Sequence, residues 1–195
     1  MSTEFIAMLD LLQMLVFSPR TGILMVLLIV AATIDARSGR IPNWLVFGGA
    51  IYAIAYNSFF PLYPRDIGFL FALQGLGVGL VAFLPLYILR VMGAGDVKLM
   101  AMVGAFLGTW ATVYAVLATL LAGGVLAVAL TVRSGVFVRM LRNVYTAFRG
   151  TVLAFAAGVT GVGGHDGPSA GKMPYGVAIA VGTIGYLLLD QLAYI

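Results

Sequence analysis

Long stretches without a charged side chain are the feature that most limits how this chain can fold. Five of them contain 14, 24, 23, 34 and 17 residues, at positions 21–34, 41–64, 67–89, 99–132 and 173–189. A helix needs about 20 apolar residues to cross a hydrocarbon core of roughly 30 Å. Charged residues make up only 9% of the chain, against about 25% in an average soluble domain. The pattern therefore predicts a polytopic membrane protein and excludes a soluble globule or a disordered chain.

These stretches divide into about six expected transmembrane helices, so the predicted fold class is all-α. The 34-residue stretch would be about 51 Å long as one helix, and we divide it near Gly108. The 14-residue stretch is short, so its helix is expected to run past Asp35 toward Gly39. The expected spans are 20–38, 42–61, 67–91, 96–108, 110–132 and 174–194. Glycines spaced four apart predict close packing of the third and fourth spans: Gly75, Gly79, Gly104 and Gly108.

Basic residues set the expected orientation, because loops rich in lysine and arginine face the cytoplasm. Of the 11 lysines and arginines, only Arg20 and Arg65 fall at one face. The other face is therefore expected to be cytoplasmic, with both termini on the opposite side. It holds Arg37, Arg40, Arg90, Lys98, Arg133, Arg139, Arg142, Arg149 and Lys172.

The remaining segments do not fit the six spans. Residues 137–149 place their basic side chains on one arc and predict a basic amphipathic helix at the membrane interface. Residues 150–164 are interpreted as interfacial or re-entrant, and the N-terminal segment 1–19 is left unassigned. We expect residues 1–195 to form a single integral-membrane domain, with 133–172 as its cytoplasmic or interfacial segment.

Two of the seven acidic residues, Asp35 and Asp96, fall at the inner boundary of an expected span. Asp35 lies at the inner end of the first expected span, and Asp96 lies at the inner start of the fourth. The chain crosses the membrane twice between them, so both reach the same face at similar depth. Ionisable groups in a membrane are costly and usually functional, so we interpret the two together.

A pair of aspartates can hydrolyse a peptide bond without a metal or another cofactor. When two carboxyl groups are held close together, they share one proton. The ionised carboxylate then takes a proton from a water molecule, and the protonated carboxyl group supplies a proton to the leaving amine. The chain has no cysteine and one histidine, which disfavours thiol and metal chemistry. Gly93 and Gly95 would let an extended substrate approach the backbone. Lys98 is either a boundary cation or a group that biases the pair's charge or meets an acidic substrate group.

Simpler explanations for each aspartate stay open at this stage. Asp96 after Gly95 could be a helix N-cap, and Asp35 could pair with Arg37 or Arg40. The two acids could also be relay groups of a small transporter or proton channel, although both lie at one face and no matching halves are visible. A non-catalytic membrane scaffold would leave the matched aspartates unexplained.

Three short motifs surround the two aspartates and the last span. They are Asp35-Ala36-Arg37 followed by Ile41-Pro42-Asn43, Gly93-Ala94-Gly95-Asp96 followed by Val97-Lys98-Leu99, and Met173-Pro174-Tyr175-Gly176-Val177-Ala178. In content and order they resemble the motifs of type IV prepilin peptidases, which are G-x-G-D membrane aspartyl proteases. The resemblance covers roughly residues 20–195.

The resemblance implies an aspartic endopeptidase that cuts prepilins or pilin-like secretion proteins (pseudopilins). Their short basic leader would be removed, usually after a glycine, at the cytoplasmic face of a prokaryotic inner membrane. Membrane lipid is the other expected partner, and no nucleic acid is expected. The resemblance assigns catalysis to Asp35 and Asp96. The supporting residues it assigns are Arg37, Pro42, Asn43, Gly93, Gly95, Lys98, Pro174, Tyr175 and Gly176.

One departure from the larger members concerns methylation. Those members carry paired cysteines in a cytoplasmic domain between the first two spans and also N-methylate the new terminus. Here only residues 38–41 join these spans, and the chain has no cysteine. The chain therefore resembles the short form, and methyltransferase activity is not expected.

Overall fold

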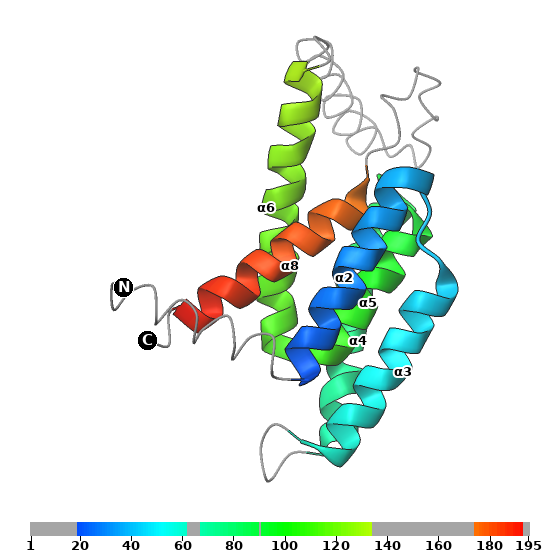
Figure 1. The fold of residues 1–195 in the computed structure, drawn as a ribbon, viewed down its shortest axis with the longest axis vertical. Helices are drawn as coiled ribbons and strands as arrows, with labels where there is room; N and C mark the ends of the chain where they lie inside the picture. Colours follow the sequence, from blue (N-terminus) through cyan, green and yellow to red (C-terminus); the bar gives the residue numbers. More distant parts are fainter. Residues whose placement is uncertain (1–18, 62–66, 90, 134–173, 193–195) are drawn as a thin grey trace, which may run out of the picture. The chain divides into compact units, whose positions relative to one another are not determined.

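The computed structural model describes residues 19–61, 67–89, 91–133 and 174–192, and within these ranges every regular element is a helix. The expected amphipathic helix at 137–149 and the segment 150–164 lie outside the described residues. The helices are α2 (Pro19–Ser38), α3 (Asn43–Phe59), α4 (Gly68–Ile88), α5 (Ala94–Leu107), α6 (Thr109–Arg133) and α8 (Tyr175–Leu192), as labelled in Figure 1.

Five of these six helices lie within an expected span or extend beyond it by one residue. The exception is α5, which begins at Ala94, two residues before its expected span. Four stretches are long and apolar enough to cross a membrane: Pro19–Ser38, Gly68–Ile88, Thr109–Ala129 and Tyr175–Leu192. The other two helices, α3 and α5, have 17 and 14 residues. At about 1.5 Å per residue α5 is about 21 Å long. The all-helical membrane class is thus confirmed, whereas six complete crossings stay a prediction.

Two glycines end helices where the sequence predicted it. Gly39 has a φ of 61° and closes α2, its N–H donating to the carbonyl oxygen of Asp35 at 2.8 Å. Gly108 has a φ of 76° and divides the long uncharged stretch into α5 and α6. Residues with a side chain rarely adopt this left-handed backbone conformation, whereas glycine adopts it at no steric cost. Glycine therefore ends the helix at each of these positions.

The chain divides into two compact units, residues 1–123 with 174–195, and residues 124–173. Of the second unit, only the last residues of α6, up to Arg133, belong to the described ranges. The first unit contains α2, α3, α4, α5, α8 and the start of α6, and it holds both aspartates. A single integral-membrane domain stays a prediction.

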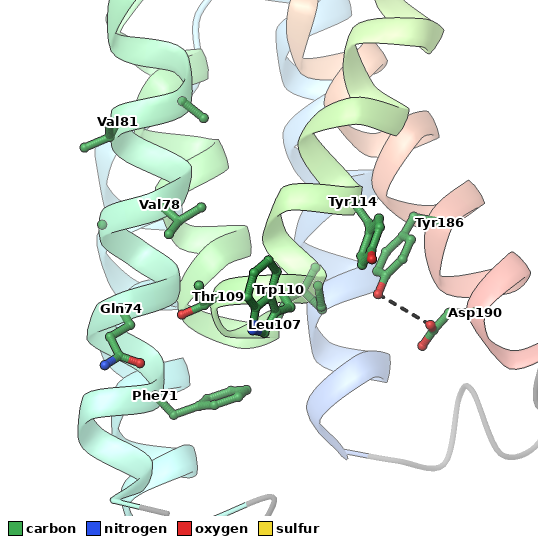
Figure 2. A pocket seen from close by; sticks show the side chains of 13 residues that line it. Phe71, Gln74, Val78, Val81, Leu107, Thr109, Trp110, Tyr114, Tyr186 and Asp190 are labelled. Carbon is green, nitrogen blue, oxygen red and sulfur yellow. Dashed lines mark hydrogen bonds between the residues drawn. The ribbon is translucent and has the colours of Figure 1, made fainter.

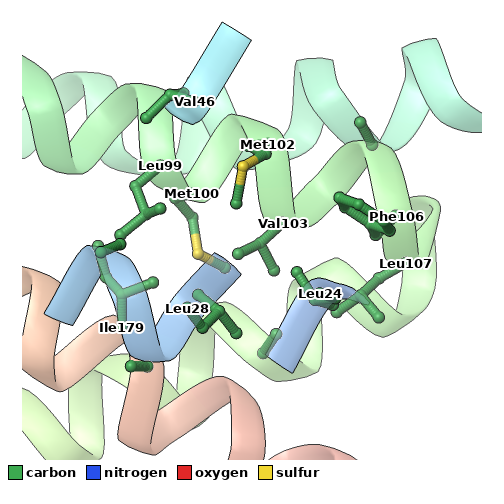
Figure 3. Close-up of a cluster of buried hydrophobic side chains, with 14 of the residues drawn as sticks. Leu24, Leu28, Val46, Leu99, Met100, Met102, Val103, Phe106, Leu107 and Ile179 are labelled. Carbon is green, nitrogen blue, oxygen red and sulfur yellow. The ribbon is translucent and has the colours of Figure 1, made fainter. Parts of the chain in front are cut away.

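Helix α5 forms the core of the first unit, and 11 of its 14 residues are buried. Its side chains Leu99, Met100 and Val103 are fully buried, together with Leu28 from α2 and Ile179 from α8 (Figure 3). Because its neighbours cover it on all sides, α5 presents almost no surface to lipid. A helix that is apolar all round is expected in such a central position.

Close contact between backbones lets α4 pack against α5. A Cβ atom on Gly104 would collide with the backbone carbonyl oxygen of Gly75, and one on Gly79 would meet the backbone of Met100. Helices approach this closely only where small residues face each other. The packing role predicted for these glycines is therefore confirmed.

Two polar side chains also join helices to α5. Arg20, at the start of α2, donates from Nε to the carbonyl oxygen of Phe106 at 2.6 Å. Asn57 of α3 is buried and donates from Nδ2 to the carbonyl oxygens of Ala53 and Ala105, at 2.9 and 3.0 Å. The cation of Arg20 suits this position, because the last carbonyls of a helix carry partial negative charge.

We expect Gly104→Ala to destabilise the protein, because the backbone oxygen of Gly75 leaves no space for the new methyl group. Overpacking of this kind costs about 1–3 kcal/mol, so the thermal midpoint in detergent should fall. Gly77→Ala on α4 is the matched control, since its Cβ would have no heavy atom within 4 Å. Alanine is the better helix former, so this control should keep or raise the midpoint. Equal midpoints for both variants would contradict the close contact.

Candidate active site

Asp35 and Asp96 lie at the same end of the helix bundle, which we call the aspartate end. Asp35 is in the last turn of α2 and Asp96 is in the first turn of α5. Helix α3 runs away from this end and helix α4 runs back toward it, so the chain returns to this end before α5 begins (Figure 1). Both side chains are buried, at 6% and 8% exposure, and their carboxyl groups interact electrostatically. The structure thus brings together the two residues that the sequence singled out.

The start of α8 holds Asp35. The backbone N–H of Gly176 donates to Oδ2 of Asp35 at 2.8 Å, across 141 positions of sequence. A Cβ on Gly176 would lie 2.8 Å from that oxygen and 2.9 Å from the Cβ of Asp35. Glycine at this position therefore lets the backbone reach the carboxylate, and the C-terminal motif belongs to the same site as the first motif.

The turn before α5 holds Asp96. Gly93 is the N-cap of α5, and its N–H donates to Oδ2 of Asp96 at 3.0 Å. Asp96 is therefore the third residue of the helix and not its N-cap, as one interpretation of the sequence had it. Its carboxylate satisfies a backbone donor and also complements the positive end of the helix dipole.

The two carboxylates share a pattern of hydrogen bonding. In each, Oδ2 accepts one backbone N–H, from Gly176 for Asp35 and from Gly93 for Asp96. Among the described residues no hydrogen bond reaches Oδ1 of either aspartate. Within the part of the chain that the structure describes, a glycine N–H thus holds each carboxyl group at one oxygen.

The connection between α2 and α3 packs directly on the glycine motif. A Cβ on Gly95 would lie 3.3 Å from the Cβ of Ile41, which is closer than a side chain fits without a shift. Pro42 is the N-cap of α3, with extended backbone. The lack of a side chain at Gly95 therefore allows this connection to pack closely on α5.

Lys98 contacts two residues of α3. Its Nζ donates to Oδ1 of Asn43 at 3.1 Å and lies 5.4 Å from the centre of the Phe47 ring. Such a cation–π contact adds to the hydrogen bond. Lys98 and Asn43 thus join the first turns of α5 and α3 beside the site.

The remaining predicted residues differ in their exposure and in their contacts. Arg37 is exposed, as is Arg40, and Asp35 is held by Gly176 instead of by either arginine. Pro174 is half-buried and its carbonyl oxygen accepts the N–H of Val177 as α8 begins. Tyr175 is half-buried, and its phenol interacts electrostatically with Asp96.

Sequence reasoning assigned no role to Ile41 or Phe47. Ile41 stands within a quoted motif, whereas Phe47 carries no charge, turn or spacing signal that could mark it. Within the described ranges, His, Asp and Glu side chains form no group of three or more that could hold a metal ion.

Comparison with known proteins adds to this geometry. No curated protein and no solved structure matches the chain significantly. A model of the type IV leader peptidase family matches residues 22–128, which is more than half of the chain and includes Asp35 and Asp96. The chain therefore belongs to the type IV leader peptidase family.

Proposed function

We propose that this protein is an aspartic endopeptidase that removes the short basic leader of type IV prepilins or pseudopilins, with Asp35 and Asp96 as its catalytic residues. The family supports the peptidase class and a prepilin-type substrate. One observation supports the catalytic pair above all others. Two buried carboxyl groups interact at one end of the bundle, each held at a single oxygen by a glycine N–H.

The mechanism follows from two carboxyl groups that share one proton. The ionised aspartate takes a proton from a water molecule while the water oxygen attacks the scissile carbonyl carbon. The protonated aspartate hydrogen-bonds the carbonyl oxygen in this step. When the C–N bond breaks, a proton passes from the pair to the leaving amine, so peptide and water become an acid and an amine.

The location of the site suits a substrate that is cut at a membrane surface. Asp35 lies near the end of α2 and Asp96 near the start of α5. We place this end at the cytoplasmic face of the inner membrane, because most basic residues belong to the loops on that side. Arg37 and Arg40, both exposed, lie beside it. A basic leader would then remain in the cytoplasm while the hydrophobic helix behind it stays in the bilayer.

Asp35→Asn and Asp96→Asn should each abolish cleavage of a co-expressed prepilin. Each amide keeps the shape of the side chain but can neither accept nor donate the shared proton. The measurement is the mobility shift of the prepilin on a gel, with membrane insertion of each variant checked by blotting. Asp66→Asn, which removes a carboxylate between α3 and α4, is the control and should cleave normally. Full cleavage by either variant would overturn the assignment.

Gly176→Ala should slow cleavage about 10- to 100-fold, because the added methyl group would displace the Asp35 carboxylate. Gly185→Ala on the same helix is the matched control, since its Cβ would have no heavy atom within 4 Å. Initial rates with purified enzyme and prepilin provide the comparison. Equal rates for the two variants would show that Gly176 does not position Asp35 for catalysis.

Labelling of single cysteines tests the orientation, because the natural chain has none. Arg40→Cys lies between α2 and α3 at the aspartate end, and Pro61→Cys lies just after α3 at the opposite end. A membrane-impermeant maleimide should label Arg40→Cys in inverted vesicles and Pro61→Cys in intact cells. The reverse pattern would place the aspartates on the outer face.

A further inference from the structure

A cavity of about 1140 Å³ lies toward the end of the helix bundle opposite the aspartates. Figure 2 shows its lining, which includes Gln74 of α4 and Trp110 of α6. No residue of the candidate active site lines it. The contacts that set the position of Asp35 relative to Asp96 are found instead at the aspartate end.

Residues 39–43 run from the end of α2 to the first residue of α3, and we call them the bridge. Hydrogen bonds tie the bridge to the helix of Asp35. The N–H of Gly39 donates to the carbonyl oxygen of Asp35 at 2.8 Å. The hydroxyl group of Ser38 donates to the carbonyl oxygen of Arg40 at 3.1 Å. Because one of these bonds is made by Asp35 itself, a displacement of the bridge also displaces the end of α2.

The bridge is fixed to α5 on both sides of Asp96. Before Asp96, a Cβ on Gly95 would lie 3.3 Å from the Cβ of Ile41, so the two backbones are in close contact. After Asp96, Nζ of Lys98 donates to Oδ1 of Asn43 at 3.1 Å. The bridge therefore connects the last turn of α2, with one carboxyl group, to the first turn of α5, with the other.

The cation that holds the bridge is itself held by neutral groups. Nζ of Lys98 bonds the amide of Asn43 and lies 5.4 Å from the centre of the Phe47 ring. Among the residues that the structure describes, Lys98 forms no ion pair with Asp35 or Asp96. An ammonium group close to two carboxyl groups favours ionisation of both, which opposes the sharing of one proton. Asn43 therefore gives the cation a partner on α3 and leaves the pair of carboxyl groups to share its proton.

We propose that Lys98 and Asn43 are positioning residues of the peptidase. Their hydrogen bond fixes the bridge on α5 and thereby sets the separation of the two carboxyl groups. This inference rests on the proposed catalytic role of the aspartates. A misplacement of about 1 Å at a reacting group lowers a rate by about 100-fold. Loss of the bond should therefore slow the chemical step and leave the affinity for the substrate nearly unchanged.

A double-mutant cycle tests the bond. Lys98→Met removes the donor and keeps an unbranched side chain, and Asn43→Leu removes the acceptor at a similar size. Each should lower kcat about tenfold at an unchanged KM, and the double variant should be no slower than either single variant, because both break one bond. Asn43→Asp keeps an acceptor for the ammonium group and should keep the wild-type kcat. The measurement is the initial rate of cleavage by purified enzyme at several prepilin concentrations.

Arg133→Met is the matched control, because it removes one cation from the end of α6 by the same substitution. It should cleave at the wild-type rate. Additive losses in the double variant would overturn the proposal, since Lys98 and Asn43 would then act separately. A loss confined to Lys98→Met would also overturn it, because the cation would then act directly on the carboxyl groups or on the substrate. A change in KM alone, or full activity of both single variants, would likewise contradict it.

A distance measurement tests the positioning without any peptidase activity. The natural chain has no cysteine, so Arg37→Cys and Ala94→Cys place spin labels at the exposed end of α2 and the exposed start of α5. In electron paramagnetic resonance, adding Lys98→Met or Asn43→Leu should broaden the distribution of label separations, whereas adding Arg133→Met should not. An unchanged distribution would overturn the proposal. A broadened one in a protein that cleaves no prepilin would support the positioning role while the proposed function fails.

Discussion

The backbone contact between α4 and α5 is the constraint on which the rest of the structure depends. Gly75 and Gly104 allow the two helices to meet without intervening side chains. Since α2, α3 and α8 also pack on α5, this 14-residue helix is almost wholly enclosed by protein. A helix this short is poorly suited to facing lipid across a core of roughly 30 Å. Because protein encloses α5, the helix does not have to span the hydrocarbon core against lipid. The same enclosure places the first turn of α5, with Asp96, inside the bundle.

Burial of two carboxyl groups is costly, and the chain offsets the cost with backbone donors. An unpaired polar group in an apolar setting is strongly destabilising, whereas one hydrogen bond compensates for much of the loss. Gly176 supplies the bond to Asp35 and Gly93 supplies the bond to Asp96. These donors come from the start of α8 and from the turn before α5, so the site exists only when α2, α5 and α8 are packed together.

Much of the helical layout could be predicted from the positions of charges and glycines. The division at Gly108 and the end of α2 at Ser38 both agree with the structure, because glycine tolerates backbone angles that other residues avoid. Contacts between distant segments could not be predicted in this way. The bond from Lys98 to Asn43 and the packing of Ile41 on Gly95 depend on how α3 lies against α5, which no local pattern encodes.

The sequence by itself determined the membrane class, the order of the helices and the pairing of Asp35 with Asp96 at one face. Hydrophobic length and the count of crossings are properties of the chain that need no contact to evaluate. Only the tertiary structure decided that Gly176 holds Asp35, that Gly93 caps the helix of Asp96, and that α4 and α6 leave a cavity at the opposite end. The physical reason is that hydrogen bonds, close packing and cavities arise between segments far apart in sequence, where spacing along the chain carries no information on distance.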